Sequence, residues 1–176
     1  MMHIFNLKIL PQEFKYYALN YEYQTDDILK DLSLSAKRKK YLSKSEFLEI
    51  CKWKTPRSQP LCLLNSEDYI KEITHISLTT KSDQLAIEIL TLLNGVSWPT
   101  ASAILHFCHV DEYPILDFRA LFTLGFDKTP KYNYQFWKDY TSYCRELGKR
   151  FNSDLRTVDR ALWQYSKKHQ KSDKQS

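Results

Sequence analysis

The sequence predicts an all-α protein of about eight helices, and three observations carry this prediction. Apolar residues recur every three or four positions, which is the period of a helix with one buried face. Glycine, which destabilises helix interiors, occurs only three times in 176 residues. Proline is absent between Pro60 and Pro99 and again after Pro130. We expect one all-α domain over residues 1–168, followed by a polar, frayed tail over 169–176.

Serines mark four of the expected helix starts. A serine before a helix accepts a hydrogen bond from a first-turn amide, and an acidic residue just after it suits the positive end of the helix dipole. The four serines and the segments that follow them are Ser45 with EFLEICKW, Ser66 with EDYIKEITHI, Ser82 with DQLAIEILTLL and Ser153 with DLRTVDRALWQYSKK. Two more helices are expected between Pro11 and Lys40.

Glycines mark the expected helix ends. Gly125 and Gly148 follow ALFTL and CREL, where a left-handed residue that ends a helix is wanted. Gly95 interrupts the apolar pattern LLNGVSWPTASAIL, so one helix is expected to stop at Asn94 and the next to restart at Trp98 or Pro99.

Two interpretations of this turn remain open on the pattern alone. In the first, the backbone N–H groups of residues 95–100 face outward at a helix start, which is a site that favours a phosphate oxygen. In the second, the turn is a plain corner between helices, and Val96 fills the core beneath it.

Composition excludes several classes of protein. No apolar run approaches the roughly 20 residues that span a bilayer, and the start MMHIFNLKIL is too short and too poor in basic residues for a signal peptide. We therefore expect a cytoplasmic protein with no membrane partner. The four cysteines never form a C-x-x-C pair, so we expect reduced, mostly buried thiols and neither a zinc nor an iron–sulfur site. The net charge of +5 permits an anionic partner without requiring one.

The segment LLNGVSWPTASAILHFCHVDEYPILDFRALFTLG resembles the helix-hairpin-helix DNA glycosylase superfamily. The hairpin of that superfamily typically reads L-P-G-V-G-x-x-T-A, and an aspartate follows it. The resemblance is closest to the adenine glycosylase branch, where the aspartate lies in a segment like F-P-I-L-D; here YPILD ends at Asp117. The similarity covers about a fifth of the chain. KWKTPR, ASAILHF, YPILD and DRALW are also similar to a bacterial branch that implies a fold and no reaction.

The resemblance implies a catalytic role for Asp117. In the superfamily this carboxylate faces the extruded nucleotide and stabilises the positively charged sugar as the base departs. The alternative is that Asp117 only caps the helix FRALFTLG, because aspartate is favoured at that position for its own sake.

Two further positions bear on the chemistry that the resemblance implies. Branches that also cut the DNA backbone carry a lysine where this chain has Pro99, so any glycosylase activity here would be monofunctional. The adenine glycosylase branch protonates the leaving base with a glutamate in an early helix. Glu49 is the candidate for that role, and its alternative is a solvated helix residue.

Double-stranded DNA is the partner that the resemblance implies, bound by a monomer. The candidate contacts in the hairpin are Gly95, Val96, Ser97, Trp98 and Thr100. The segment CKWKTPRSQP adds Lys54 and Arg57 as candidates, and its Trp53 either stacks on a base or anchors the loop to the core. Arg119 either pairs with Asp117 or reaches a phosphate.

No metal site is expected from the sequence. His106 and His109 lie on one helical face, but no third ligand is evident. The resemblance implies a monovalent cation held by the hairpin carbonyls instead. The aromatic residues of YNYQFWKDYTSYC and DRALWQYSKK, including Trp137 and Trp163, are expected to fill the core.

Three functions follow from these residues. The first is a monofunctional DNA glycosylase that removes a damaged or mismatched base. The second is a non-catalytic DNA-binding module that has the same hairpin. The third is a protein–protein adaptor that retains the fold without the DNA site.

Overall fold

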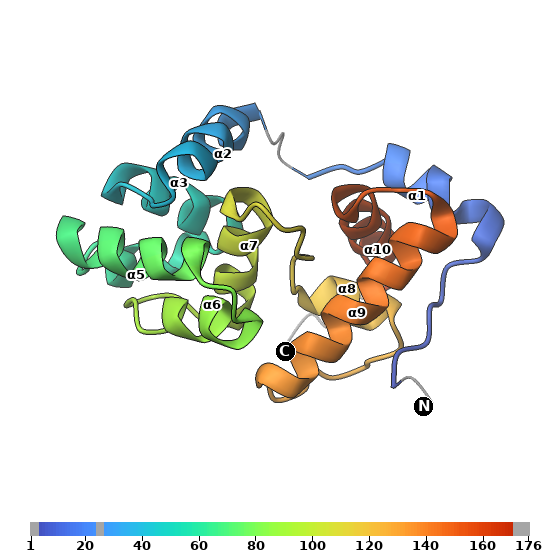
Figure 1. The fold of residues 1–176 in the computed structure, drawn as a ribbon. Coiled ribbons are helices and arrows are strands. Elements are labelled where there is room, and N and C mark those ends of the chain that lie inside the picture. Colours follow the sequence, from blue (N-terminus) through green and yellow to red (C-terminus); the bar gives the residue numbers. More distant parts are fainter. Residues whose placement is uncertain (1–3, 24–26, 171–176) are drawn as a thin grey trace, which may run out of the picture. The chain divides into compact units, whose positions relative to one another are not determined.

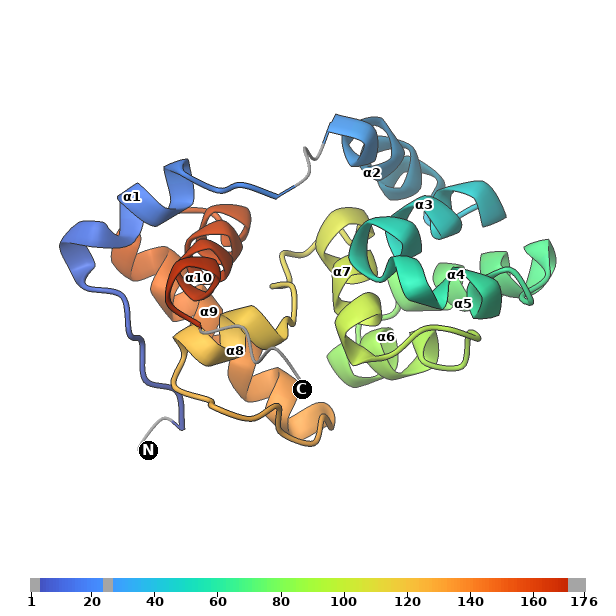
Figure 2. The same ribbon diagram turned by 180° about the vertical axis from the view of Figure 1, so that it is seen from behind.

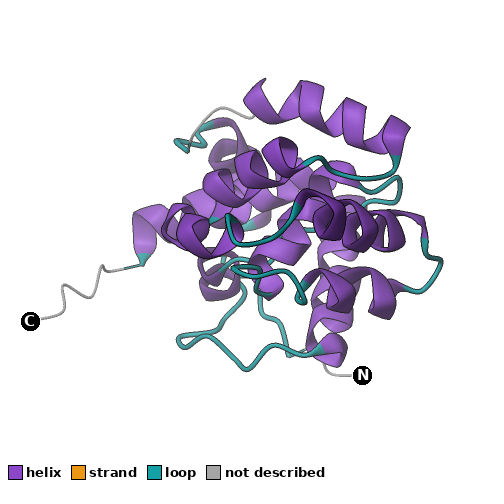
Figure 3. Ribbon diagram, turned by 90° about the vertical axis from the view of Figure 1, so that its left-hand side faces the viewer, coloured by secondary structure: helices purple, strands orange, loops and turns teal. Residues whose placement is uncertain are grey.

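The computed structural model describes residues 4–23 and 27–170, and these residues are helical, with no strand (Figure 3). This confirms the all-α prediction. Ten α-helices lie in the described residues, two more than expected. Their bounds are α1 Phe14–Leu19, α2 Asp27–Lys39, α3 Lys44–Lys54, α4 Gln59–Cys62, α5 Glu67–Thr79, α6 Asp83–Leu90, α7 Trp98–Cys108, α8 Phe118–Thr123, α9 Tyr134–Phe151 and α10 Leu155–His169 (Figure 1). Two 3-10 helices are η1 Pro11–Glu13 and η2 Pro56–Ser58.

The chain divides into two compact units. Unit 1 combines the two ends of the chain, residues 1–23 and 116–176, and unit 2 contains residues 24–115. The expectation of one domain over 1–168 stays a prediction. Of the expected tail, His169 is the last residue of α10, and residues 171–176 lie outside the described residues. No helix within the described ranges has the length and apolar character needed to cross a membrane.

Unit 2 is built around α7. Eight of its eleven residues are buried, so it is apolar around most of its circumference and packs against α2, α3 and α6. The prolines of the segment after α3 had suggested a loop, but η2 and the short α4 occupy it. A proline is tolerated in each because it lies in the first turn, where its missing N–H has no intrahelical partner.

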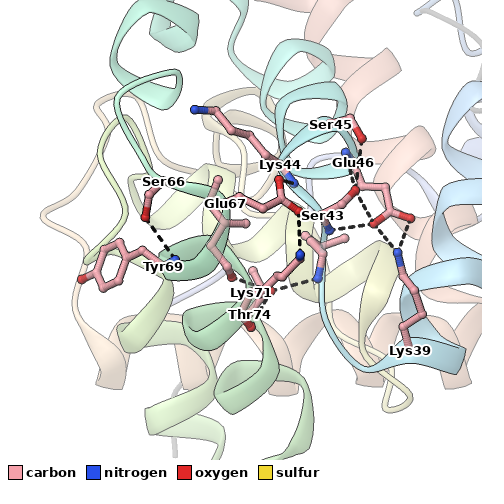
Figure 4. A network of polar contacts seen from close by, with 12 residues as sticks. Lys39, Ser43, Lys44, Ser45, Glu46, Ser66, Glu67, Tyr69, Lys71 and Thr74 are labelled. Carbon is pink, nitrogen blue, oxygen red and sulfur yellow. Dashed lines mark hydrogen bonds and ion pairs between the residues drawn. The ribbon is translucent and has the colours of Figure 1, made fainter.

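A polar network fixes the starts of α3 and α5 (Figure 4). Ser43 and Glu46 form a capping box at the start of α3, and Lys39 pairs with Glu46 at 2.6 Å. A carboxylate oxygen of Glu67 accepts a bond from the Lys44 amide at 3.0 Å, which ties α5 to α3. The prediction that Ser45 caps α3 is wrong by two residues, because only Ser43 has a glutamate three positions later to complete the box.

Unit 1 is built around α10, which packs against α1, α8 and α9 (Figure 2). Trp137 is fully buried, as expected, whereas Trp163 is only half-buried. The extended segment before η1 lies along the end of α8: the amides of Asn6 and Lys8 donate to the carbonyls of Leu124 and Thr123 at 2.8 and 2.9 Å. Segments more than 100 residues apart in sequence therefore share one core.

Two of the predicted caps in unit 1 are wrong. Gly148 lies inside α9, and its missing Cβ leaves room for the Ser153 carbonyl, which would be 2.9 Å from a Cβ. The helix ends instead at Asn152, which takes the left-handed conformation. Asp154 rather than Ser153 caps α10, because α10 begins at Leu155 and the Asp154 side chain accepts a bond from the Thr157 amide in its first turn. Gly125 ends α8 as predicted.

Candidate nucleic-acid interface

The turn between α6 and α7 requires glycine at position 95. Gly95 has a φ of +80°, a conformation that costs other residues about 1–2 kcal/mol. A Cβ on Gly95 would also lie 2.6 Å from the Cys62 sulfur and 2.9 Å from the Cys62 backbone nitrogen. The predicted stop at Asn94 is late, since α6 ends at Leu90 and the chain turns over residues 91–97. The prediction of a left-handed, tight turn at Gly95 is confirmed.

Asn65 clamps this turn to the segment between α4 and α5. Its side-chain amide donates to the Cys62 and Asn94 carbonyls at 2.9 and 3.0 Å, and its side-chain oxygen accepts from the Asn94 amide at 2.9 Å. Asn65 is 2% exposed, so these three bonds are shielded from water. Nothing in the local sequence pattern singles out this asparagine, and its role follows only from the tertiary contact.

A second contact brings the basic segment to the same place. The Thr55 and Thr100 hydroxyls lie 3.2 Å apart and are hydrogen-bonded. Thr55 stands between Lys54 and Arg57, which are half-buried and exposed respectively. Two stretches that the sequence predicted separately, the hairpin and the basic segment, are therefore adjacent in unit 2.

The start of α7 has an open first turn. Within the described part of the chain, no side chain caps its first amides, and Pro99 stands in that turn. Ser97 is exposed and Trp98 is half-buried, so both face outward at least in part. Val96 and Thr100 are buried, which confirms that Val96 fills the core; any contact of these two residues with DNA runs through their backbone.

Trp53 is a core residue. It is 8% exposed, and its ring meets the Phe107 ring edge-on at 5.1 Å between centroids. The interpretation that Trp53 anchors the loop is therefore right, and the interpretation that it stacks on a base is wrong. Glu49 is exposed on α3.

Asp117 caps α8. Its Oδ1 accepts a hydrogen bond from the Arg119 backbone amide at 2.8 Å, and the side chain remains half-exposed. The capping interpretation is thus confirmed as a contact, while the catalytic interpretation stays a prediction. Asp117 and Glu49, the two catalytic candidates, belong to different units.

Tyr132 lies close to Asp117 within unit 1. Burial, and then the negative charge of Asp117, raises the pKa of Tyr132 to about 12. Its hydroxyl thus stays protonated to a higher pH than that of an ordinary tyrosine. Sequence reasoning missed this proximity, because Tyr132 stands among five other aromatic residues between Phe126 and Tyr140.

The Arg119 guanidinium lies between two aromatic rings. Its carbon is 5.3 Å from the centre of the Phe118 ring and 5.2 Å from the centre of the Trp163 ring. The hydrogen bond to Asp117 comes from the Arg119 backbone amide. The Arg119 guanidinium itself has no ion pair among the described residues. The positive charge therefore remains available to an anion.

His106 in α7 and His109, the residue just after α7, have structural partners. His106 Nδ1 is 2.6 Å from the Tyr113 carbonyl oxygen, and His109 Nδ1 accepts from the Asp111 amide at 3.0 Å. Burial lowers the pKa of His109 and keeps its ring neutral. In the described residues no three His, Cys, Asp or Glu side chains gather as metal ligands.

The carbonyls of the turn do not form a free set of cation ligands. The carbonyls of Leu93, Asn94 and Ser97 accept bonds from Val96, Asn65 and Ala101. Each of these oxygens keeps a second lone pair, so the monovalent cation that the resemblance implies stays a prediction.

All four cysteines are free and buried, as predicted. A hydrogen bond with Cys62, together with burial, raises the pKa of Cys51. The Cys51 thiol is therefore neutral, whereas the same hydrogen bond lowers the pKa of Cys62.

Comparison with known proteins adds no relative. No protein-family model matches the chain, and no curated protein or solved structure matches it either. The function must therefore be argued from the residues.

Proposed function

We propose that this chain binds double-stranded DNA through the α6–α7 turn and the adjacent basic segment, and removes a base with the help of Asp117. The observation that carries the DNA-binding part is the hydrogen bond between Thr55 and Thr100. It brings the segment that contains Arg57 next to the start of α7, which supports a site where backbone amides and a cationic side chain together bind a phosphate oxygen.

The chemistry proposed is hydrolysis of the bond between base and sugar. A carboxylate at position 117 stabilises the positive charge that develops on the sugar as the base leaves, and water then adds to that sugar. Pro99 stands at the hairpin position from which a lysine would attack the sugar. Because proline has no amine to form a Schiff base, the reaction would end at the abasic site.

The activity is tested with a panel of duplexes, each carrying one damaged or mismatched base, scored for abasic sites by alkali cleavage. The matched variant is Asp117→Asn, because asparagine caps a helix as well as aspartate does and removes only the charge. We expect product from at least one duplex and a loss of at least about 100-fold in rate for the variant.

DNA binding is tested separately, by the salt dependence of duplex affinity. Arg57→Gln should weaken binding and lower the slope of log affinity against log salt by about 1. Lys81→Gln is the control, because Lys81 precedes α6 at the end opposite the turn and is also exposed. Equal affinities of the two variants would overturn the assignment of the DNA surface.

A non-catalytic DNA-binding module is the second candidate. The observation that favours it is the cap on α8, which gives Asp117 a structural role without any chemistry. Salt-dependent binding with no product from any duplex would establish this module. If the chain bound no DNA at all, the protein–protein adaptor would be the remaining candidate function.

A further inference from the structure

The charges of the chain are distributed unevenly between the two units. Unit 1 contains 15 Lys and Arg against 9 Asp and Glu, a net charge of +6. Unit 2 contains 11 Lys and Arg against 12 Asp and Glu, a net charge of −1. The unit that carries the predicted hairpin is therefore not the unit that carries the positive charge, which gives unit 1 its own attraction for anions.

Part of this positive charge lies on a row of aromatic rings. Phe118 and Arg119 come from the start of α8, Trp163 and Lys167 from α10, and Tyr21 from the segment after α1. We call these five residues the aromatic ladder. The Arg119 guanidinium carbon is 5.3 Å from the centre of the Phe118 ring and 5.2 Å from that of the Trp163 ring, and Lys167 Nζ is 5.5 Å from the Trp163 ring. Lys167 Nζ also pairs with the Glu22 carboxylate at 2.9 Å.

At the Tyr21 end of the ladder, the aromatic ring and the charged groups already have partners within the protein. The guanidinium groups of Arg156 and Arg160 lie over the Tyr21 ring at 5.1 and 5.5 Å. Arg156 also pairs with Asp159, whose side chain is buried. This end therefore holds α10 against the segment after α1 and is not the part that faces a ligand.

The Phe118 end is different. The Phe118 ring is 51% exposed although it stands in the first turn of a helix that is otherwise well packed. Beside it, the Arg119 guanidinium contacts two aromatic rings and has no ion pair in the described residues. The exposed ring offers one face for a base, and the neighbouring arginine offers one charge for the following phosphate.

We propose that the aromatic ladder binds single-stranded DNA, with a base stacked on Phe118 and a backbone phosphate held by Arg119. A duplex is a poor ligand for it, because the faces of paired bases are covered by their neighbours and only a single strand can stack on a protein ring. This goes beyond the proposed function, which places a duplex on unit 2, and it stands on contacts within unit 1 alone.

The test is fluorescence anisotropy of a labelled 12-nucleotide oligothymidylate with the full chain. The double variant Phe118→Ala with Arg119→Gln should weaken binding at least about 10-fold, the loss expected for one stacked base. The matched control is Tyr134→Ala with Lys138→Gln, which removes one ring and one charge from α9 and should bind as the wild type does.

Arg119→Gln alone provides a second readout. The Arg119 guanidinium has no ion pair among the described residues, so its replacement leaves no carboxylate without its partner, and it should lower the salt slope of oligothymidylate binding by about 0.7. Thermal melts of all variants show whether any loss reflects unfolding. No binding by the wild type, or equal binding by the ladder and control variants, would overturn the proposal.

Two further arms separate this site from the proposed duplex site and from another ligand. Arg57→Gln should weaken duplex binding and leave oligothymidylate binding unchanged. Failure of duplex binding with oligothymidylate binding intact would refute the proposed function alone. Tighter binding of oligouridylate than of oligothymidylate would overturn the assignment to DNA.

Discussion

At the scale of single residues, Gly95 shows how one missing atom shapes the candidate interface. Gly95→Ala should lower the free energy of unfolding by about 2–4 kcal/mol, because it adds a strained φ and a contact with the Cys62 backbone that cannot shift cheaply. Urea denaturation at neutral pH measures this loss.

Gly125→Ala is the matched control for Gly95→Ala. Gly125 also has a positive φ, of +97°, but a Cβ there would meet its nearest neighbour at 3.4 Å, an ordinary contact. It should cost only the conformational strain of about 1–2 kcal/mol. Equal losses for the two variants would show that Cys62 does not crowd position 95.

Asn65 is the residue that fixes the turn in place, and its removal is the second prediction. Asn65→Ala deletes three hydrogen bonds of a buried side chain and should cost about 2–4 kcal/mol in the same denaturation experiment. Asn94→Ala should cost under about 0.5 kcal/mol, because Asn94 takes part through its backbone and its side chain is exposed. A large loss of unfolding free energy for Asn94→Ala would show that the Asn94 side chain, and not only that of Asn65, holds the turn in place.

At the scale of helices, the capping box of α3 makes stability depend on pH. Burial acts against it, but hydrogen bonds from Lys39 and Ser43 outweigh burial and lower the pKa of Glu46 below its usual 4.5. A carboxylate whose pKa is lowered by folding stabilises the protein above pH 4.5, and this stabilisation is lost as pH falls through the folded-state value.

Glu46→Gln should therefore cost about 1–2 kcal/mol at pH 7, since glutamine retains the capping geometry but loses the charge that pairs with Lys39. The difference from the wild type should shrink as pH falls below 4.5, where the wild-type carboxyl also becomes neutral. Glu72→Gln, at an exposed position on α5, should show no such trend. A difference that is constant from pH 7 to pH 3 would contradict the prediction.

Helix starts show how far local sequence determines local structure. Ser66 and Ser82 cap α5 and α6 as predicted, because each serine lies three residues before an amide that is otherwise unbonded. The predictions at Ser45 and Ser153 failed where a better local partner was present: the Ser43 and Glu46 pair in one case and Asp154 in the other. Neighbouring caps compete, and small differences in geometry decide between them.

At the scale of the whole molecule, the sequence predicted the helices but not how distant segments combine. The hairpin and the basic segment were each recognisable locally, yet only Asn65 and the Thr55–Thr100 bond show that they are adjacent. The proximity of Tyr132 to Asp117 and the aromatic ladder were missed for the same reason. Each depends on contacts between residues that no periodicity links.

The joining of the two chain ends in unit 1 gives the last prediction. Phe14 stacks on Phe151 with ring centres 4.0 Å apart, and the Tyr17 hydroxyl lies 2.8 Å from His169 Nε2. Deleting residues 1–23 removes these partners and exposes apolar surface on α9 and α10, at about 1.5–3 kcal/mol for each buried aromatic side chain lost.

Amide hydrogen exchange on that deletion variant should show α8, α9 and α10 exchanging at least about 100-fold faster than in the full chain. The amides of α3 and α7, which lie in unit 2 and have their own core, serve as the internal control and should keep their protection. Loss of protection in both units together would mean that the whole chain unfolds as one cooperative body. Retained protection in α9 and α10 would mean that the N-terminal segment contributes little to the core of unit 1.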